Sequence, residues 1–495
     1  MHRIAYLSEL LIYMDIRMNY FFSLQLFLNY FSIPIESSFG LPFIPPMLHN
    51  EGNYICSLGQ VIRWLGKEAE SLGVDIFTGS PAAEVLYNKD SPTNPKVIGI
   101  ATADVGISKT GELKDSYSRG MEIVGKQTLF AEGARGSCTE DLVNTYQLRK
   151  GKDPQTYGLG LKEIWRIPKD KCKPGYIQHS LGWPLTSDIY GGSFLYHMEP
   201  DLVLLGFVVG LDYANPYISP YMEFQRWKHH PAIAKHLEGG ECIQYGARVI
   251  NEGGLQSIPK LTFPGGALIG CTAGFLNVPK VKGTHTAMQS GIVAADSIID
   301  QLNTKEGIDN GVEITQYEKN MEKSWVYEEL NQVRNIHPSF KAGFIPGIIY
   351  SGLTSFILKG REPWTFHNTV SDADKTKPAA EFKPINYPRP DGKLSFDLLT
   401  NLTRSGTNHE HDQPPHLRIR PGMEDTPAKV SYNVYAAPES RFCPARVYEY
   451  PEPGKLVINA QNCLHCKACA IKTPKEYIKW TVPEAGGGGP AYEIM

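Results

Sequence analysis

The sequence predicts a mixed fold in which α/β and α+β regions share one chain of 495 residues. Apolar residues recur at helical spacing over Leu58–Leu72 and alternate at strand spacing over Tyr157–Ile167. Glycine-rich turns follow short apolar strands at 130–136 and 263–271, and α/β folds bind their ligands at such turns. A chain of this length holds two or three domains with sizeable cores.

Composition excludes several classes of function. The hydrophobic fraction of 42% and the charged fraction of 20% are typical of a globular protein. The formal net charge is −3 and no dense basic run occurs, so we expect no nucleic-acid partner. The mean hydropathy of −0.27 excludes a protein with many membrane spans, but not one that dips into a single leaflet.

The most specific pattern is a set of cysteines near the C-terminus. Cys463, Cys466 and Cys469 recur at every third position, and Cys443, followed by proline, precedes them. A 4Fe–4S cluster takes four thiolates, three of them usually from one compact loop. Two residues between successive ligands let the backbone curl around the cluster with its amides directed at the sulfurs. The sequence therefore predicts that Cys443, Cys463, Cys466 and Cys469 bind a 4Fe–4S cluster.

Zinc and disulfides are the alternatives for these cysteines. Structural zinc prefers separated pairs of cysteines, and a shared central cysteine strains a tetrahedral site. Disulfides need an oxidising compartment, and no secretory signal is visible. The chain has nine cysteines, which cannot all pair. The cluster remains the preferred interpretation.

The first hundred residues begin with an unusual segment. Residues 1–31 are apolar but interrupted by charges, too short to span a bilayer, and we expect a short helix there. The acidic residues spoil a mitochondrial transit peptide, and no cleavage site is apparent. Beyond this segment we expect one helix and then short strands, over Leu58–Leu72, Val74–Phe77, Val85–Tyr87 and Val97–Ala103.

The middle of the chain is expected to hold a second, β-rich domain over Tyr157–Leu211. Its Gly191-Gly192 pair permits a close approach to the backbone, although a simple turn is the alternative. Glu223–His230 reads as a helix on a domain surface. Farther on, a glycine loop leads to a helix that starts near Gly283-Thr284. The free amides of such a helix suit an anionic flavin ring, with packing alone as the alternative.

Two later segments admit more than one interpretation. Residues 342–360 carry no charge between Lys341 and Lys359, which predicts an in-plane or partly inserted membrane helix or, alternatively, a buried core helix. The histidines and acids of Gly406–Pro414, within a wrapping connector, could suggest metal ligands. We prefer a hydrogen-bonded loop there, because no second cluster of ligands is evident in the sequence.

Taken together, these residues resemble the electron-transfer flavoprotein–ubiquinone oxidoreductase family, from about Ile33 to Met495. The last two of the matching motifs are the most specific, because few flavoproteins carry a C-terminal ferredoxin-like domain. The motifs are FAEGARG at 130–136, YGGSFLYH at 190–197, EFQRWKHHP at 223–231, FPGGALIGC at 263–271, NVPKVKGTHTAM at 277–288, SGTNHEHDQP at 405–414, RFCP at 441–444 and INAQNCLHCKAC at 458–469.

The resemblance implies an FAD-dependent oxidoreductase-type fold, with a β-rich quinone-binding domain and a C-terminal ferredoxin-like 4Fe–4S domain. It divides the chain into an atypical N-terminal segment at 1–31, an FAD domain in two parts at 32–150 and 256–335, a ubiquinone-binding domain at 151–255, a membrane-associated segment at 336–365, and a connector with the iron–sulfur domain at 366–495.

The resemblance also implies an enzyme, an electron-transferring-flavoprotein dehydrogenase. Such an enzyme takes electrons from reduced electron-transfer flavoprotein and delivers them to ubiquinone through a 4Fe–4S cluster and FAD, linking fatty-acid and amino-acid oxidation to the respiratory chain. The implied location is the matrix side of the mitochondrial inner membrane, where the protein is monotopic. No catalytic acid, base or nucleophile is needed, because the cofactors carry the chemistry. The implied contacts are Gly133, Gly270, Gly283, Thr284, His285 and Thr286 with FAD, and Gly191 and Gly192 with ubiquinone.

The sequence departs from the family at its start. The family opens its FAD domain with a strand and a G-x-G-x-x-G turn that admits the pyrophosphate. The nearest match here, Gly158-Leu159-Gly160, lacks the third glycine and the strand–turn–helix context. We therefore expect an N-terminally truncated or altered FAD domain, with an incomplete first βαβ unit and a weaker hold on FAD.

Two alternative functions remain open at this stage. One is an iron–sulfur remnant without FAD and without activity, which the absent fingerprint would favour. The other is a related flavoprotein reductase of isoprenoid lipids, which would need no terminal cysteine set.

Overall fold

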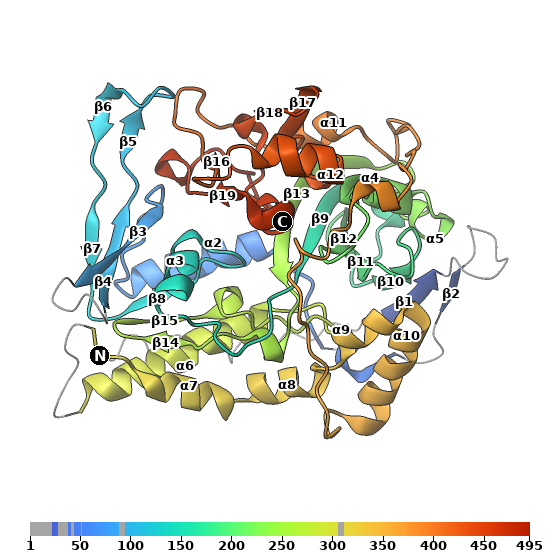
Figure 1. Ribbon diagram of the computed structural model, residues 1–495. Helices are drawn as coiled ribbons and strands as arrows, with labels where there is room; N and C mark the ends of the chain where they lie inside the picture. The colour runs from blue at the N-terminus through green and yellow to red at the C-terminus, as the bar shows by residue number, and fades with distance from the viewer. Residues whose placement is uncertain (1–21, 28–37, 41–43, 51, 89–94, 305–310) are drawn as a thin grey trace.

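A seven-stranded sheet forms the centre of the molecule. The computed structural model describes residues 22–27, 38–40, 44–50, 52–88, 95–304 and 311–495 (Figure 1). Neighbouring strands of the sheet run antiparallel, except that β1 runs parallel to β10. In spatial order the strands are β13 (Glu241–Asn251), β9 (Tyr157–Arg166), β12 (Leu202–Gly210), β11 (Gly191–Met198), β10 (Ile177–Gly182), β1 (Phe22–Phe27) and β2 (Ser38–Gly40).

The two faces of this sheet differ in composition because successive side chains of a strand point to opposite faces. On one face Leu159, Leu161 and Trp165 of β9 are buried in the main hydrophobic core. The other face is rich in glycine: Gly160 lies opposite Val208, and Gly206 lies opposite Lys162. Because glycine has no side chain, these positions leave open space above the second face of the sheet.

The N-terminal segment differs from its predicted helix. Phe22–Phe27 forms β1, which pairs with β10 in parallel and with β2 in antiparallel register. The run Phe-Ser-Leu-Gln-Leu alternates apolar and polar residues, which is the period of a strand and not of a helix. The remaining residues of the 1–31 prediction lie outside the described part of the chain.

A second body contains a three-stranded sheet in the order β14-β15-β8, in which β8 and β15 run parallel. Its core joins the sheet to α3 and to the helices at the bottom of Figure 1. The elements are β8 (Thr128–Phe130), α3 (Ser137–Thr145), β14 (Thr262–Phe263), β15 (Gly266–Leu268), α6 (Thr284–Leu302), α7 (Thr315–Glu322) and α8 (Trp325–Val333).

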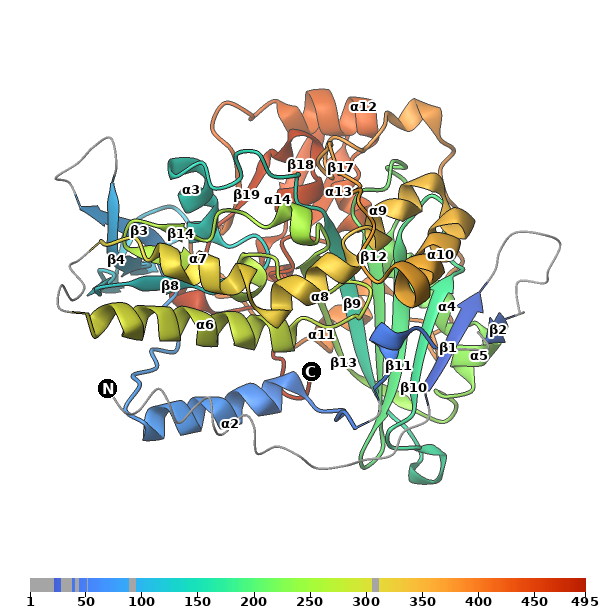
Figure 2. The same cartoon turned by 90° about the horizontal axis from the view of Figure 1, so that it is seen from below.

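The predicted helix over Leu58–Leu72 is confirmed as α2 (Leu58–Ser71), with Ser57 as its N-cap. The helix buries none of its residues, and it lies at the periphery of the molecule in Figure 2. The strand predicted at Val74–Phe77 is wrong: this segment has no strand partner among the described residues, and Phe77 is 59% exposed. Strand propensity cannot form a strand without a neighbour to accept its hydrogen bonds.

The strands predicted at Val85–Tyr87 and Val97–Ala103 are confirmed as β3 and β4, which follow α2. Two small sheets, β3-β4-β7 and β5-β6, extend from the second body at the left of Figure 1. Their strands are β3 (Ala82–Asn88), β4 (Lys96–Thr102), β5 (Val105–Ile107), β6 (Leu113–Ser118) and β7 (Glu122–Val124).

The predicted surface helix at Glu223–His230 is a helix but not a surface one. It forms α4 (Pro220–Lys228), followed by the short α5 (Pro231–Ala234), and Phe224 and Trp227 of α4 are buried against the apolar face of the large sheet. Charged residues usually indicate an exposed helix, but Lys228 of α4 is fully buried and pairs with Glu163 of β9.

The apolar segment 342–360 folds as a helix at the surface. It contains α10 (Phe344–Leu353), preceded by α9 (Ile336–Ser339) and continued by a π-helical turn over Thr354–Leu358. Ile349 is 68% exposed and Ile357 is 71% exposed, which excludes a buried core helix. No helix in the described part of the chain is both long and apolar enough to cross a bilayer.

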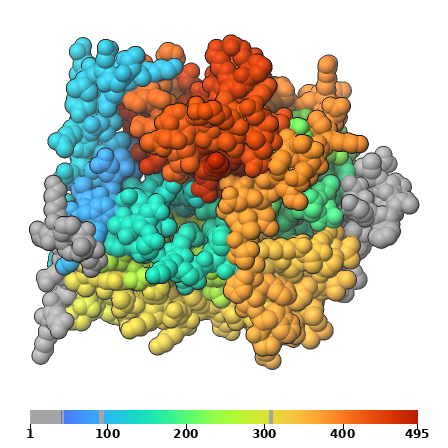
Figure 3. Space-filling model, in the orientation of Figure 1, coloured from blue at the N-terminus to red at the C-terminus, as the bar shows by residue number. Residues whose placement is uncertain are grey.

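The C-terminal region packs onto the top of the body, flanked by the connector (Figure 3). Its core is continuous with that of the large sheet, because Leu464, Tyr477 and Ile478 belong to the same buried cluster as Leu161 and Trp165. Its elements are α11 (Leu398–Thr403), β16 (Leu417–Ile419), α12 (Asn433–Tyr435), α13 (Glu439–Phe442), β17 (Tyr448–Glu452), β18 (Lys455–Ile458), α14 (Cys469–Lys472) and β19 (Ile478–Trp480).

Candidate cofactor and ligand sites

The four predicted cluster ligands converge in the C-terminal region. Cys443 ends α13, Cys469 begins α14, and Cys463 and Cys466 lie on the loop before α14. All four are free thiols with only 6–7% of their surface exposed. Four buried thiols without disulfide bonds are the donor set that a cluster requires.

The spacing of these sulfurs does not suit a single metal ion. At a Zn–S distance of about 2.3 Å, tetrahedral geometry places sulfurs about 3.8 Å apart. Among the described residues, no three cysteine sulfurs gather within 4.8 Å of one another. The sulfurs are thus more widely spaced than tetrahedral zinc requires, which favours the predicted cubane cluster over the zinc alternative.

The loop backbone curls around the sulfurs as the spacing predicts. His465 and Lys467 have left-handed backbone conformations, with φ of 54° and 68°. This curvature lets the His465 amide donate to Cys463 Sγ at 3.3 Å, and the Val447 amide donates to Cys443 Sγ at 3.5 Å. Amide donors of this kind stabilise a cluster and help to set its potential.

Electrostatics indicate that these thiols need metal in order to ionise. Burial, reinforced by the neighbouring Cys466, raises the pKa of Cys469 to about 12. Burial likewise raises the pKa of Cys466 above its ordinary value. Buried thiolates become stable only when cations compensate their charge, which iron in a cluster does. The residues present thus fit a 4Fe–4S cluster.

A large apolar cavity, of about 1390 Å³, lies on the glycine-rich face of the central sheet. Gly191 and Gly192, both predicted to contact quinone, line it, as does Lys162 of β9. The opposite wall includes Phe356 of the π-helical turn after α10. Burial lowers the pKa of Lys162 to about 8, so this lysine is a cation of adjustable charge in an apolar space.

Strand β13 connects the cavity with the cluster loop. Arg248 lines the cavity, and its Nη1 donates to the carbonyl oxygen of His465 at 2.8 Å. The next residue, Val249, donates its amide to the carbonyl oxygen of Cys466 at 3.1 Å. The wall of the cavity is therefore hydrogen-bonded directly to the loop that holds two of the cysteines.

The predicted flavin residues lie together at the carboxyl ends of the parallel strands β8 and β15. The Gly133 amide donates to Thr272 Oγ1 at 2.9 Å, which joins the two turns. At Gly270 an added Cβ would lie 3.4 Å from the Cβ of Ala287 in α6. The N-terminus of α6, at Gly283–Thr286, meets the same region, so these residues form a polar corner where a planar ring could rest.

The described residues complete only part of an FAD site. Glycine turns and a helix N-terminus suited to the flavin ring are present, but no strand–turn–helix with a G-x-G-x-x-G turn occurs among the described residues. The ring end thus fits FAD, whereas the pyrophosphate end has no recognisable cradle in this part of the chain.

His285, a predicted FAD contact, is engaged by protein groups. Its Nε2 lies 2.9 Å from Oε1 of Glu329 in α8, and its ring stacks on Trp325. Asn277 Nδ2 and Lys280 Nζ donate to the same carboxylate at 2.9 and 2.8 Å. Three donors from the glycine loop and α6 thus converge on one acid, which fixes the loop on α8.

Replacing Glu329 with glutamine is expected to destabilise the protein by about 1–3 kcal/mol, since charge-assisted hydrogen bonds are lost. Burial alone would raise the pKa of Glu329, but the bonds from His285, Lys280 and Asn277 lower it to about 2. A lowered pKa stabilises the fold above the ordinary value of 4.5, and this contribution disappears as the pH falls toward about 2. Urea unfolding of wild type and Glu329→Gln at pH 7 and pH 3 gives the difference in their free energies of unfolding. This difference should be smaller at pH 3 than at pH 7, and an equal difference at both pH values would contradict the prediction.

Sequence reasoning missed Arg248 and Lys162. A signal was present for Lys162, because it is a lone lysine in the strand Gly-Leu-Gly-Leu-Lys-Glu-Ile-Trp. Arg248 gives no comparable signal, because only the register between β13 and β9 shows that it faces the cavity beside Gly160.

The chain is similar to known proteins along most of its length. A family model described as ETF-QO, ubiquinone-binding matches residues 157–250, and one described as electron transfer flavoprotein-ubiquinone oxidoreductase, 4Fe-4S matches residues 392–493. The mitochondrial electron transfer flavoprotein-ubiquinone oxidoreductases of Bos taurus and Homo sapiens are each 54% identical, over 94% of this chain and 75% of their own length. The Arabidopsis thaliana protein of that name is 53% identical, over 91% of this chain and 70% of its own.

Among solved structures, a geranylgeranyl bacteriochlorophyll reductase-like protein from Thermoplasma acidophilum has 15% sequence identity and a TM-score of 0.46, covering 72% of this chain and 77% of its own.

A buried four-cysteine site, hydrogen-bonded to the wall of a large apolar cavity, defines an iron–sulfur oxidoreductase that acts on an apolar substrate. Sequence identity then gives the family directly. The chain belongs to the electron transfer flavoprotein–ubiquinone oxidoreductase family. FAD and a 4Fe–4S cluster are its cofactors.

Proposed function

We propose that this chain transfers electrons from reduced electron transfer flavoprotein to ubiquinone. One observation carries the proposal for this chain: β13 forms part of the cavity wall and also hydrogen-bonds the cysteine loop through Arg248 and Val249. An electron donor and its acceptor site are thus separated by a single strand. The isoprenoid-lipid reductase alternative does not need the four cysteines, and the remnant alternative does not need the cavity.

Ubiquinone reduction consumes two electrons and two protons and yields ubiquinol. Cys443, Cys463, Cys466 and Cys469 would hold the cluster, which carries one electron at a time. FAD, when bound, can hold one or two electrons and so supplies the pairing that a two-electron product needs. The glycine face would admit the flat quinone head, and Lys162 would stabilise the negative charge that develops on its oxygens.

Narrowing the cavity should weaken quinone binding and leave the cluster intact. An alanine Cβ at Gly192 would lie 2.7 Å from Leu181 Cδ2 and 3.1 Å from the Ser180 carbonyl oxygen, and the Leu181 side chain lines the same cavity. We expect Gly192→Ala to raise the KM for a soluble ubiquinone analogue by roughly tenfold, the effect of one misplaced methylene.

The assay follows oxidation of reduced electron transfer flavoprotein by the quinone, with iron content and flavin absorption measured on the same sample. The matched control is Gly125→Ala, which lies outside the cavity and would meet its nearest neighbour at an ordinary 3.4 Å. Wild-type protein that contains cluster and flavin but reduces no quinone would refute the function. An unchanged KM in Gly192→Ala would remove Gly192 from the quinone site.

Membrane binding through α10 is part of the same proposal. The relatives are named as mitochondrial proteins, and we place this chain on the matrix side of the inner membrane, at its surface. Exposed apolar residues of α10 and of the π-helical turn that follows it lie beside the cavity, and they support this membrane placement. An apolar quinone could pass from the leaflet to the cavity along this surface.

Replacing Ile349 with aspartate is expected to weaken vesicle binding by at least about tenfold, because a buried isoleucine contributes roughly 1.5–3 kcal/mol. Sedimentation with phosphatidylcholine–cardiolipin vesicles measures the effect. Val124→Asp is the control, since Val124 is 58% exposed on β7, far from α10. Equal losses in the two variants would contradict insertion through α10.

A further inference from the structure

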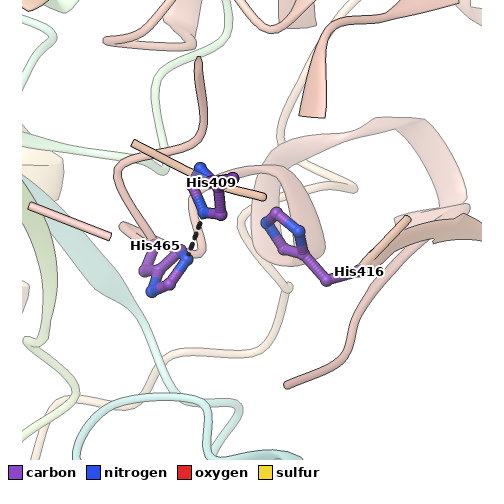
Figure 4. Close-up of side chains that lie close together, drawn as sticks. All are labelled: His409, His416 and His465. Atoms are coloured by element: carbon purple, nitrogen blue, oxygen red, sulfur yellow. Dashed lines mark hydrogen bonds between the residues drawn. The ribbon is translucent and has the colours of Figure 1, made fainter. Parts of the chain in front are cut away.

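Three histidines from separate segments meet beside the cluster loop. His409 comes from the connector, His416 directly precedes β16, and His465 lies between two of the cysteines. One ring nitrogen of each lies within 4.8 Å of the other two, and Figure 4 shows the three rings grouped around a common space. Among the described residues this is the only such group of three histidine, cysteine or acidic side chains.

The contacts of His409 leave one of its nitrogens available as a ligand. Its Nδ1 lies 2.8 Å from the carbonyl oxygen of Gln461, and a carbonyl can only accept, so Nδ1 carries the proton. In a neutral ring Nε2 then carries a lone pair, which accepts a hydrogen bond from His465 Nε2 at 2.8 Å and could bind a metal ion once His465 gives up that proton. Metal-bound histidines show this arrangement, with one nitrogen donating to a carbonyl and the other facing the ion.

His416 supplies an independent observation. The residue is only 2% exposed, and its Nε2 is buried without a hydrogen-bond partner in the described part of the chain. Its ring stacks on that of His409 at 4.9 Å between centroids and 15° between planes. A buried nitrogen without a partner costs about 1–3 kcal/mol, and a metal ion in the space between the rings would satisfy it.

We propose that His409, His416 and His465 bind one Zn²⁺ ion, which forms a second metal centre beside the cysteine site. At a Zn–N distance of about 2.0–2.1 Å, tetrahedral ligands lie about 3.3 Å apart, so the close His409–His465 pair must open by roughly 0.5 Å. Imidazole suits zinc, whereas Ca²⁺ and Mg²⁺ require oxygen ligands that this group lacks. Because His465 is only partly buried, water can occupy the fourth position.

The surrounding charges set the strength of this site. Arg248 donates to the His465 carbonyl oxygen, and Lys467 lies 4.6 Å from the centroid of the Trp480 ring, which also contacts His416 and His465. These cations weaken the binding of a dication, and the four cysteine thiolates of the assembled cluster oppose them. The zinc site is therefore expected to be tighter with the cluster present.

The C-terminal glycine loop holds the histidine rings in place. An added Cβ at Gly488 would lie 2.3 Å from Cδ2 of His409, and one at Gly489 would lie 2.6 Å from Nδ1 of His465. The loop therefore packs directly against both rings, and side chains there would displace them. A zinc ion would tie the connector, the cluster loop and this terminal loop together at one point.

The test uses the full chain with its cluster assembled under anaerobic conditions. The protein is dialysed against a mild chelator, exposed to a small excess of ZnSO₄, desalted, and analysed for iron and zinc by mass spectrometry. We expect about one zinc per chain in addition to four irons. X-ray absorption at the zinc edge should show nitrogen and oxygen neighbours only, near 2.0 Å, since zinc displaced into the cysteine site would show sulfur at about 2.3 Å.

His416→Gln is expected to lose the zinc and to keep its iron, because His416 is not one of the four cysteine ligands of the cluster. His411→Gln is the control, since His411 is an exposed histidine of the same loop and should keep the zinc. Iron content and circular dichroism report whether each variant is folded. Sulfur around the zinc, zinc gained only as iron is lost, or equal zinc in both variants would overturn the proposal, and none of these outcomes affects the proposed electron transfer.

Discussion

Replacing Cys466 with serine is expected to abolish the cluster and electron delivery to quinone. The thiol is 7% exposed on a loop whose backbone bonds directly to β13, so a neighbouring residue cannot take its place without rearranging the cavity wall. A serine hydroxyl is a poor iron ligand at neutral pH because it stays protonated. Activity should fall by more than about 100-fold, beyond the 10–100-fold loss typical of changes outside the ligand shell.

Iron analysis, visible absorption and electron paramagnetic resonance of the reduced protein measure the loss. Cys172→Ser is the matched control, because Cys172 donates to the Met198 carbonyl oxygen and belongs to no group of three metal-ligating side chains among the described residues. Four irons and an unchanged signal in Cys466→Ser would show that the ligand set is wrong. Loss of iron in both variants would point to misfolding instead of lost ligation.

The cluster site could be predicted because it is local. Three of its cysteines span seven residues, Cys463–Cys469, and the cluster chemistry dictates their spacing. Long strands such as β9 and β12 and the helix α6 were also predictable, since their apolar periodicity extends over 9 residues or more. In these segments local pattern and tertiary packing agree.

The sequence predicted Gly191 and Gly192 as quinone contacts, but it could not predict the rest of the cavity, because strand register creates it. Gly160 and Gly206 are far from Gly192 in the sequence, and each reads as an ordinary strand glycine. Only the pairing of β9, β12 and β11 places them on one face, where the Phe194 ring packs directly over Gly206. The same limitation applies to the histidine group, because His416 and His465 are 49 positions apart in a chain whose loops bring them together.

The errors of prediction have the same origin. Val74–Phe77 has strand composition but no neighbour to pair with in the described structure, whereas Phe22–Phe27 pairs with β10, some 150 positions later. Likewise α4 reads as a surface helix because it carries three charged residues among nine. Its burial depends on Glu163, which is more than 50 positions earlier in the sequence and neutralises Lys228.

That buried pair leads to the second large prediction: replacing Lys228 with methionine should cost about 3–5 kcal/mol of folding free energy. Lys228 Nζ lies 2.9 and 2.8 Å from the two oxygens of Glu163, and both side chains have no exposed surface. Trp165, Gln225 and Asn401 donate the remaining bonds to the carboxylate, at 2.8, 3.2 and 2.7 Å. Methionine would fill the space but leave a buried negative charge held only by neutral donors.

Chemical denaturation measures the cost, or the melting temperature at a fixed scan rate if unfolding is irreversible. Lys429→Met is the matched control, since Lys429 pairs with Asp425 at 2.6 Å but both side chains are more than 70% exposed, and its loss should cost at most about 1 kcal/mol. The double variant Lys228→Met/Glu163→Gln should recover part of the loss, because it removes the uncompensated charge as well as the pair. Equal effects of the two lysine substitutions would mean that the Glu163 carboxylate is protonated or hydrated in the folded protein. In that case the apolar packing of Phe224 and Trp227, and not the ion pair, would fix the position of α4 on the large sheet that forms the cavity.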